Sequence, residues 1–328
     1  MSARILIAGG WGLVGGTIAT LLRQAGHDVD LVLAGRRPET GADLAQRLDA
    51  RTVRLDVADP GQALAAVGPI DLVIAALQDP DDTLLAAALT SGAGHIGIVR
   101  TVGNMATSAV VAASLARRPA LMLGHWQAGV MTLTALAAAQ AFAEVDRVEM
   151  AALYDYADPI GPMTASDSGG FVGQALIREE GHWRNVNAAE AGRSVERDGH
   201  PAFDAMPMGV LDTPALAART GARDVRFDLG AGTSIGSAAG GPASHDLYID
   251  LAGRDARGAA MTRRTLVTDP AGQAHLTAVG VLIGAERVLG LDGAPPPPAG
   301  LTFPEAVIDP AKAVARLRAF GVRIEEVA

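Results

Sequence analysis

Short apolar runs alternate with helix-like segments over the first 125 residues. The apolar runs occupy Arg4–Ala8, Val29–Ala34, Thr52–Leu55, Leu72–Ala76, His95–Val99 and Ala120–Leu123. They are apolar at consecutive positions rather than at every second one, which is typical of strands covered on both faces in a parallel sheet. The helix-like segments between them are Leu13–Gln24, Glu39–Leu48, Pro60–Val67, Asp81–Leu89 and Asn104–Ala116. This order predicts an α/β domain, a Rossmann-type doubly wound parallel sheet, over residues 1–125.

The pattern changes after residue 125. Alternating runs, typical of antiparallel strands, follow a looser stretch that contains the charged run Arg193–Asp198, which we expect to be a solvated loop. We therefore expect an α+β domain with a mixed or antiparallel sheet over residues 126–298, and a C-terminal segment, 299–328, that returns to the first domain. The expected strands are Arg147–Leu153, Asp224–Leu229, Asp246–Leu251 and Met261–Asp269, and the expected helices are Ala128–Phe142, Leu276–Leu289 and Pro310–Phe320.

Composition excludes several classes of protein. The chain has 328 residues, 49% of them hydrophobic, and no cysteine, which excludes a disordered chain, a disulfide-stapled fold and thiolate metal sites. The formal net charge of −9 offers no basic surface to nucleic acid. The longest uncharged stretch, Pro119–Ala143, is interrupted by glycine and polar residues, so we expect no membrane span and a cytoplasmic protein.

A glycine motif follows the first expected strand directly. Residues Gly9, Gly10, Trp11, Gly12, Leu13, Val14 and Gly15 open the first expected helix. Gly10 permits a tight turn, Gly12 lets the backbone approach a pyrophosphate, and Gly15 lets the helix pack on the strand. Strand, turn, helix and second strand occur in the right order, so we expect a dinucleotide site. Trp11 is unusual here, and either packs over the pyrophosphate or covers the domain surface.

The end of the second strand predicts which dinucleotide binds. NAD-binding chains carry an acidic residue about twenty residues after the glycine loop, for the ribose 2′-hydroxyl. This chain has Gly35, Arg36 and Arg37 there. A glycine leaves room, and two guanidinium groups can clamp a 2′-phosphate, which favours NADP(H). Asp56 either contacts adenine or stabilises a turn, and we expect Ala76, Leu77 and Gln78 to line the cofactor site after the fourth strand.

Several motifs resemble those of the saccharopine dehydrogenase-like (saccharopine reductase-like) oxidoreductases. They lie along nearly the whole chain: Gly9–Gly15, Ala34–Gly35–Arg36, Leu55–Asp56–Val57, Gly94–Gly97, Gly124–Gly129, Glu180–Trp183 and Gly300–Glu305. The resemblance implies a Rossmann domain, a second domain that covers the nicotinamide, hydride transfer to or from a C=N or C=O carbon, and a homodimer. Gly97 and Ala128 stand where many relatives have aspartate and proline. Without that aspartate an ammonium group has no partner, so we expect a small organic substrate other than saccharopine.

Few side chains could supply the proton that accompanies hydride transfer. We name His125, Tyr154, Tyr156 and Asp79 as catalytic candidates, although His125 and the tyrosines could be structural, and Asp79 could cap the helix near Asp81. Candidate substrate-binding residues are Trp126, Gln127, Ser166 and Ser168. His245–Asp246 could form a dyad, but its place at the start of a strand favours the surface. The seven histidines lack i, i+4 pairing, so we expect no metal site.

Two functions remain open from the sequence. The first is an NADP(H)-dependent oxidoreductase. The second is a protein that binds NADP(H) without turnover, as a sensor or scaffold, because the carboxylate at position 97 and an unmistakable proton donor are missing.

Overall fold

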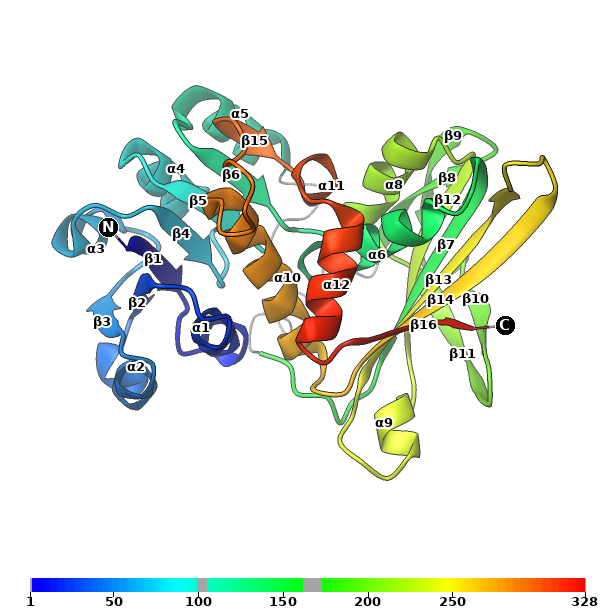
Figure 1. Ribbon diagram of the computed structural model, residues 1–328, viewed down its shortest axis with the longest axis horizontal. Coiled ribbons are helices and arrows are strands. Elements are labelled where there is room, and N and C mark those ends of the chain that lie inside the picture. The colour runs from blue at the N-terminus through cyan, green and yellow to red at the C-terminus, as the bar shows by residue number, and fades with distance from the viewer. Residues whose placement is uncertain (1, 99–104, 162–172, 328) are drawn as a thin grey trace. The chain divides into compact units, whose positions relative to one another are not determined.

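The computed structural model describes residues 2–98, 105–161 and 173–327. The chain divides into two compact units, each built from two stretches of sequence (Figure 1). Unit 1 consists of Met1–Gly124 and Thr277–Ile308, and unit 2 of His125–Leu276 and Asp309–Ala328.

Unit 1 is built on a seven-stranded sheet in which every pairing is parallel. The strand order is β15-β6-β5-β4-β1-β2-β3, in which the chain first moves outward from β1 to β3 and then crosses to β4 on the other side. This is the doubly wound arrangement, so the predicted Rossmann-type sheet is confirmed. The strands are β1 (Ala3–Ala8), β2 (Val29–Gly35), β3 (Arg51–Arg54), β4 (Leu72–Ala75), β5 (Gly94–Gly97), β6 (Pro119–Met122) and β15 (Gly300–Thr302).

Both faces of this sheet are covered. Ile5 and Ile7 on one face of β1, and Leu6 on the other, have no exposed surface. Leu6 belongs to a cluster formed with α3 and α4, and Gly284 of α10 lies against Leu121 of β6. The helices are α1 (Leu13–Gln24), η1 (Pro38–Gly41), α2 (Ala42–Arg47), α3 (Gly61–Val67), α4 (Thr83–Thr90), α5 (Met105–Leu115), α10 (Gln273–Leu289) and α11 (Pro304–Val307).

Unit 2 is built on a nine-stranded mixed sheet. Its main order is β10-β11-β12-β7-β13-β14-β16, and β8 pairs with both β12 and β9. Among the pairings of the described strands of this sheet, β12–β7 alone is parallel, so the predicted α+β unit with a mixed sheet is confirmed. The strands are β7 (Glu144–Tyr154), β8 (Gln174–Glu179), β9 (His182–Asn187), β10 (Arg193–Arg197), β11 (His200–Pro207), β12 (Asp224–Ala231), β13 (His245–Arg254), β14 (Ala260–Asp269) and β16 (Arg323–Val327).

Helices cover one face of the second sheet, and the sheet curls over its other face (Figure 1). Phe203 of β11 packs with Tyr248 of β13 although two strands separate them in the sheet order. Arg264 of β14 also donates to the Glu196 carbonyl of β10 at 2.8 Å. The helices are η3 (Trp126–Gly129), α6 (Val130–Ala139), α8 (Asp212–Thr220), α9 (Ile235–Ala238) and α12 (Pro310–Ala319).

The unit boundaries differ from the expected ones at the C-terminal end. Most of α10, from Thr277, belongs to unit 1 rather than to the second domain, and residues 309–328 belong to unit 2 rather than returning to the first. β16 pairs with β14 in the second sheet. An apolar stripe shows that a helix packs on a sheet, but not on which of two sheets.

The charged run at 193–198 is a strand rather than a solvated loop. β10 occupies most of it, and Arg197 is only 8% exposed. Arg197 Nε donates to the Tyr248 hydroxyl at 2.9 Å and Nη1 to the Thr233 carbonyl at 3.0 Å. The prediction of a loop was wrong because the partners that allow Arg197 to be buried come from distant parts of the chain.

Within the described ranges, no helix combines the length and the apolar composition needed to cross a membrane.

Candidate functional site

The glycine loop of unit 1 has the geometry that a dinucleotide site requires. Ala8 of β1 is in register with Ala34 of β2 and Ala75 of β4, so the loop begins where the carboxyl ends of three strands meet. Gly9 adopts φ +79°, and the N–H groups of Gly9 and Gly10 donate to the Ala34 carbonyl at 2.8 and 3.2 Å. Ligands of doubly wound sheets bind at this edge.

The two later glycines have different surroundings. A Cβ at Gly15 would overlap the Gly9 carbonyl oxygen, so only glycine allows α1 to pack this closely on the loop. Gly12 is exposed, and a Cβ there would meet only the Gly9 oxygen, at 3.2 Å. Gly12 also caps α1 without a side-chain acceptor, and the first turn has no acidic residue. The N-terminal amides of α1 are thus suited to a phosphate.

Trp11 is partly buried and packs on the end of β2. Its six-membered ring lies between Gly35, the last residue of β2, and Gly41 of η1. A Cβ at Gly35 would be 2.5 Å from Trp11 Cζ2, and one at Gly41 would be 2.8 Å from Trp11 Cδ2. The room that a glycine at position 35 was expected to leave for a ligand is therefore occupied by the indole.

The other predicted cofactor residues surround this loop. Arg36 and Arg37 are exposed, and neither side chain makes a hydrogen bond or ion pair with any described residue. Asp56 accepts from the Ala58 N–H at 3.1 Å and bridges to Asp59, as expected of a turn residue. Ala76, Leu77 and Gln78 follow β4, and the Ala76 N–H donates to the Ala8 carbonyl at 2.9 Å.

Unit 2 begins with a turn of unusual backbone conformation. Gln127 has φ 50° and ψ 47°, Ala128 has φ 54° and ψ 40°, and Gly129 has φ 92°. Two consecutive non-glycine residues in the left-handed region are strained, and such strain concentrates at functional sites. Proline is restricted to φ near −65°, so Ala128 is not a simple replacement of the proline found in saccharopine dehydrogenase-like turns.

A buried carboxylate of α8 holds this turn. Asp212 Oδ2 accepts from the Trp126 N–H at 2.6 Å, and Oδ1 from the Thr132 hydroxyl at 2.7 Å. Complete burial raises the pKa of Asp212, while the nearby His125 and these two donors oppose that rise. His125 is itself 4% exposed. The predicted proton-transfer candidate is therefore buried near an acid whose two oxygens bind Trp126 and Thr132.

Gln127 contacts a second buried polar group, the imidazole of His245. Nε2 of Gln127 lies 2.9 Å from Nε2 of His245, whose pKa burial lowers to about 3. His245 is therefore neutral, and since the Gln127 amide donates to Nε2, the ring proton is on Nδ1. Nδ1 faces Asp158 Oδ2 at 3.9 Å.

Asp158 carries an unusual pKa. Burial raises the pKa of Asp158 to about 6, and neighbouring acids add to the rise. The hydrogen bond from the Gln273 N–H to Oδ2, at 2.9 Å, acts in the opposite direction. The expectation that His245–Asp246 lies at the surface is wrong, because both residues are at most 1% exposed.

The remaining candidates are dispersed. Tyr154 ends β7, and its ring lies edge-on to that of Tyr156 at 5.2 Å, so the two tyrosines do come together, although Tyr156 is 80% exposed. Burial, and then Asp158, raise the pKa of Tyr154. Asp79 accepts from Leu84 and Leu85 in the first turn of α4 at 3.1 and 2.9 Å, which is the capping interpretation. Ser166 and Ser168 lie outside the described residues.

Asp212 and Asp158 had no place in the sequence-based site. Each precedes a proline within two residues, and Asp212 starts a helix, so both look like ordinary turn or helix-start residues. Their burial against His125 and His245 depends on contacts over more than 80 residues. His275, which hydrogen-bonds Asp269 at 2.7 Å, also gave no signal.

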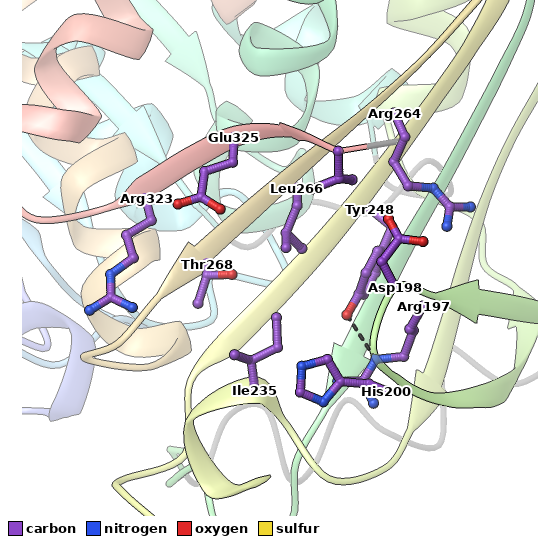
Figure 2. Close-up of a pocket in the computed structure, with 11 residues that line it drawn as sticks. Arg197, Asp198, His200, Ile235, Tyr248, Arg264, Leu266, Thr268, Arg323 and Glu325 are labelled. Carbon is purple, nitrogen blue, oxygen red and sulfur yellow. Dashed lines mark hydrogen bonds between the residues drawn. The ribbon is translucent and has the colours of Figure 1, made fainter. Parts of the chain in front are cut away.

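A pocket of about 280 Å³ lies elsewhere in unit 2, and no predicted site residue lines it (Figure 2). Arg197, held by the Tyr248 hydroxyl, forms one wall, and Leu266 and Thr268 of β14 lie opposite. Three arginines and His200 share this lining with Asp198 and Glu325, so its charges largely compensate. Among the residues that the structure describes, no group of histidines and carboxylates is arranged to hold a metal ion.

Comparisons with known proteins match the fold but not the sequence. No protein-family model matches the chain, and no curated protein does. Saccharopine dehydrogenase (L-Glu forming) from Saccharomyces cerevisiae matches with a TM-score of 0.75 at 13% identity, over 100% of both chains. Scyllo-inositol dehydrogenase from Lactobacillus casei, solved with NAD(H) and scyllo-inositol, matches with a TM-score of 0.50 at 12% identity, over 99% of both chains. The expected resemblance is thus confirmed for the fold: the chain has the fold of saccharopine dehydrogenase.

Proposed function

We propose that this chain is an NADP(H)-dependent oxidoreductase, a divergent member of the saccharopine dehydrogenase-like group. It transfers a hydride to or from a C=O or C=N carbon of a small organic substrate. Both solved structures compared above are dehydrogenases by name, and one was solved with NAD(H).

The observation that carries the proposal is the loop between β1 and α1. Gly15 leaves no space for a Cβ, Gly12 is exposed, and the first turn of α1 lacks both an acidic residue and a side-chain cap. This combination leaves backbone N–H groups for a pyrophosphate and no negative charge to repel it.

The preference for NADP(H) rests on the charges after β2. The side chains of residues 35–37 include no acceptor for a ribose 2′-hydroxyl, whereas the guanidinium groups of Arg36 and Arg37 are exposed and have no partner among the described residues. Bidentate charge-assisted hydrogen bonds to a 2′-phosphate suit such groups.

Proton transfer is assigned to His125. The bound cofactor supplies or accepts the hydride, and the protein must move one proton. Asp212 binds the backbone of Trp126, the residue after His125, and so fixes the turn that presents this histidine, while Gln127 and Trp126 belong to the same turn and remain the substrate-binding candidates. The Trp126 indole Nε1 is buried and makes no hydrogen bond with any described residue, so it is a donor that a substrate oxygen could use.

Further parts of the proposal concern the substrate and the assembly. Gly97 ends β5 without a carboxylate, which argues against an ammonium-bearing substrate such as saccharopine. A homodimer and a cytoplasmic location are proposed from the resemblance and the composition.

Calorimetry with NADPH and NADH tests nucleotide binding, and a spectrophotometric screen of NADPH oxidation against carbonyl and imine compounds tests turnover. We expect tighter binding of NADPH, and a Kd weakened about ten- to a hundredfold by Arg36→Ala or Arg37→Ala, with little change for NADH. Arg47→Ala, on the exposed side of α2, is the matched control. Absence of heat with either nucleotide refutes the proposal, and binding without turnover across the panel favours a sensor or scaffold.

A further inference from the structure

The indole of Trp11 occupies a specific place at the end of β2. In dinucleotide-binding crossovers the residue that reads the ribose 2′ position stands there, about twenty residues after the glycine loop. In this chain that residue is Gly35. Trp11 Cζ2, Cη2 and Cε2 all lie within 3.1 Å of where a Cβ of residue 35 would be.

A second glycine fits the opposite edge of the same ring. A Cβ at Gly41 would be 2.8 Å from Trp11 Cδ2 and 3.2 Å from Cζ3. Gly35 and Gly41 are both buried, and neither has a positive φ. Their backbone conformation therefore does not demand glycine, and the nearest atoms to a side chain at either position belong to the indole.

We infer that Trp11 prevents this site from reading the ribose 2′ position through a side chain at the end of β2: its indole blocks any acidic side chain at position 35. This inference rests on the proposed function. Recognition of the 2′ group is then left to Arg36 and Arg37, which directly follow Gly35.

A steric block by Trp11 predicts a different effect of Gly35→Asp than the mere absence of a carboxylate at position 35 does. If the chain merely lacked an acid, Gly35→Asp would supply the acceptor for a 2′-hydroxyl and would repel a 2′-phosphate. With the indole in place, the new Cβ collides with Trp11, so the aspartate cannot take up its position. An aspartate becomes effective only after Trp11 has been shortened.

Binding of NADPH and NADH to four proteins tests this inference: the unmodified chain, Trp11→Ala, Gly35→Asp and the double variant. Calorimetric Kd values need no substrate. We expect Trp11→Ala to keep the preference for NADPH, Gly35→Asp to bind both nucleotides poorly, and the double variant to prefer NADH, with the Kd ratio reversed by about ten- to a hundredfold. Trp183→Ala, at an exposed position of β9, controls for the loss of a tryptophan.

A stability measurement checks the packing separately. Gly41→Ala meets the same ring from its other edge, so it should lower the melting temperature of the unmodified chain but not that of Trp11→Ala. The inference is overturned if Gly35→Asp alone binds NADH as tightly as the double variant, if the double variant still prefers NADPH, or if Gly41→Ala has the same effect in both backgrounds. Failure of the unmodified chain to bind either nucleotide would instead refute the proposed function.

Discussion

Asp158 and Asp155 lie three residues apart at the end of β7 and have opposite pKa shifts. Burial raises the pKa of Asp158 from 3.8 to about 6. Burial also raises that of Asp155, but hydrogen bonds from Ser237, Ser234 and Ala157 outweigh it and lower the pKa to about 2. The two residues should therefore make opposite contributions to the pH dependence of stability.

For Asp158, the folded state holds a proton that the unfolded state has already released between pH 3.8 and pH 6. The contribution of Asp158 to the free energy of unfolding is complete below pH 3.8 and is lost as the pH rises through 6. At 1.36 kcal/mol per pKa unit the loss is about 3 kcal/mol. For Asp155 the contribution is present above pH 3.8 and is lost only as the pH falls towards 2, so it is constant from pH 4 upward.

Urea unfolding at several pH values between 4 and 8 measures this difference. In a Trp11→Phe background the two remaining tryptophans, Trp126 and Trp183, both report on unit 2. The free energy of unfolding of the parent minus that of Asp158→Asn should fall by up to about 3 kcal/mol from pH 4 to pH 7. The same difference for Asp155→Asn should stay flat in this range. A pH-independent difference for Asp158→Asn would show that its carboxylate is not buried as described.

Three other substitutions test the site. Gly15→Ala places a Cβ on the Gly9 carbonyl oxygen and should abolish calorimetric NADPH binding, whereas Gly16→Ala, which meets only the end of the Leu44 side chain at 3.2 Å, should retain it. His125→Asn should lower kcat for a substrate found by screening by about a hundredfold or more and leave the Kd of NADPH unchanged; an unaltered kcat excludes His125 from proton transfer. Ala128→Pro introduces the proline that saccharopine dehydrogenase-like turns carry at this position, and it should destabilise unit 2 by about 3 kcal/mol in urea unfolding. Proline cannot adopt the φ of +54° found at Ala128, and it has no N–H to donate to the His125 carbonyl. Ala128→Gly should not destabilise unit 2, and equal stability of the proline variant would contradict the left-handed turn.

Sequence patterns predicted unit 1 well because its elements follow one another locally. α1 occupies Leu13–Gln24 as expected, and the first six strands of unit 1 all form near the expected positions. Unit 2 was harder to predict because β8 to β11 carry many charges, and their side chains find partners only in the folded sheet. Arg193 of β10 is an example: its Nε donates at 2.7 Å to the completely buried Asp228 of β12, which lies 35 residues further along the chain.

In the candidate site, too, features set by local sequence could be predicted and features set by distant contacts could not. Spacing led us to expect the tight turn at Gly10 and close helix packing at Gly15, since a crossover has few possible geometries, but the residue of the loop with positive φ is Gly9. The position of Trp11 could not be derived from spacing, because it depends on how η1 approaches β2. Likewise Asp212 and His245 become neighbours of the His125–Gly129 turn only through contacts of 80 residues or more.

The chain path has a consequence for synthesis on the ribosome. β15, the outermost strand of the first sheet, begins at Gly300, and α10 supplies residues to both units. Unit 1 therefore cannot complete its sheet until residues up to Thr302 have been made, unlike a domain encoded in one continuous stretch, which can fold as it emerges. Nascent chains stalled before residue 277 should expose the β6 edge and the apolar surface that α10 covers, and should need chaperone protection until α10 and β15 have been made.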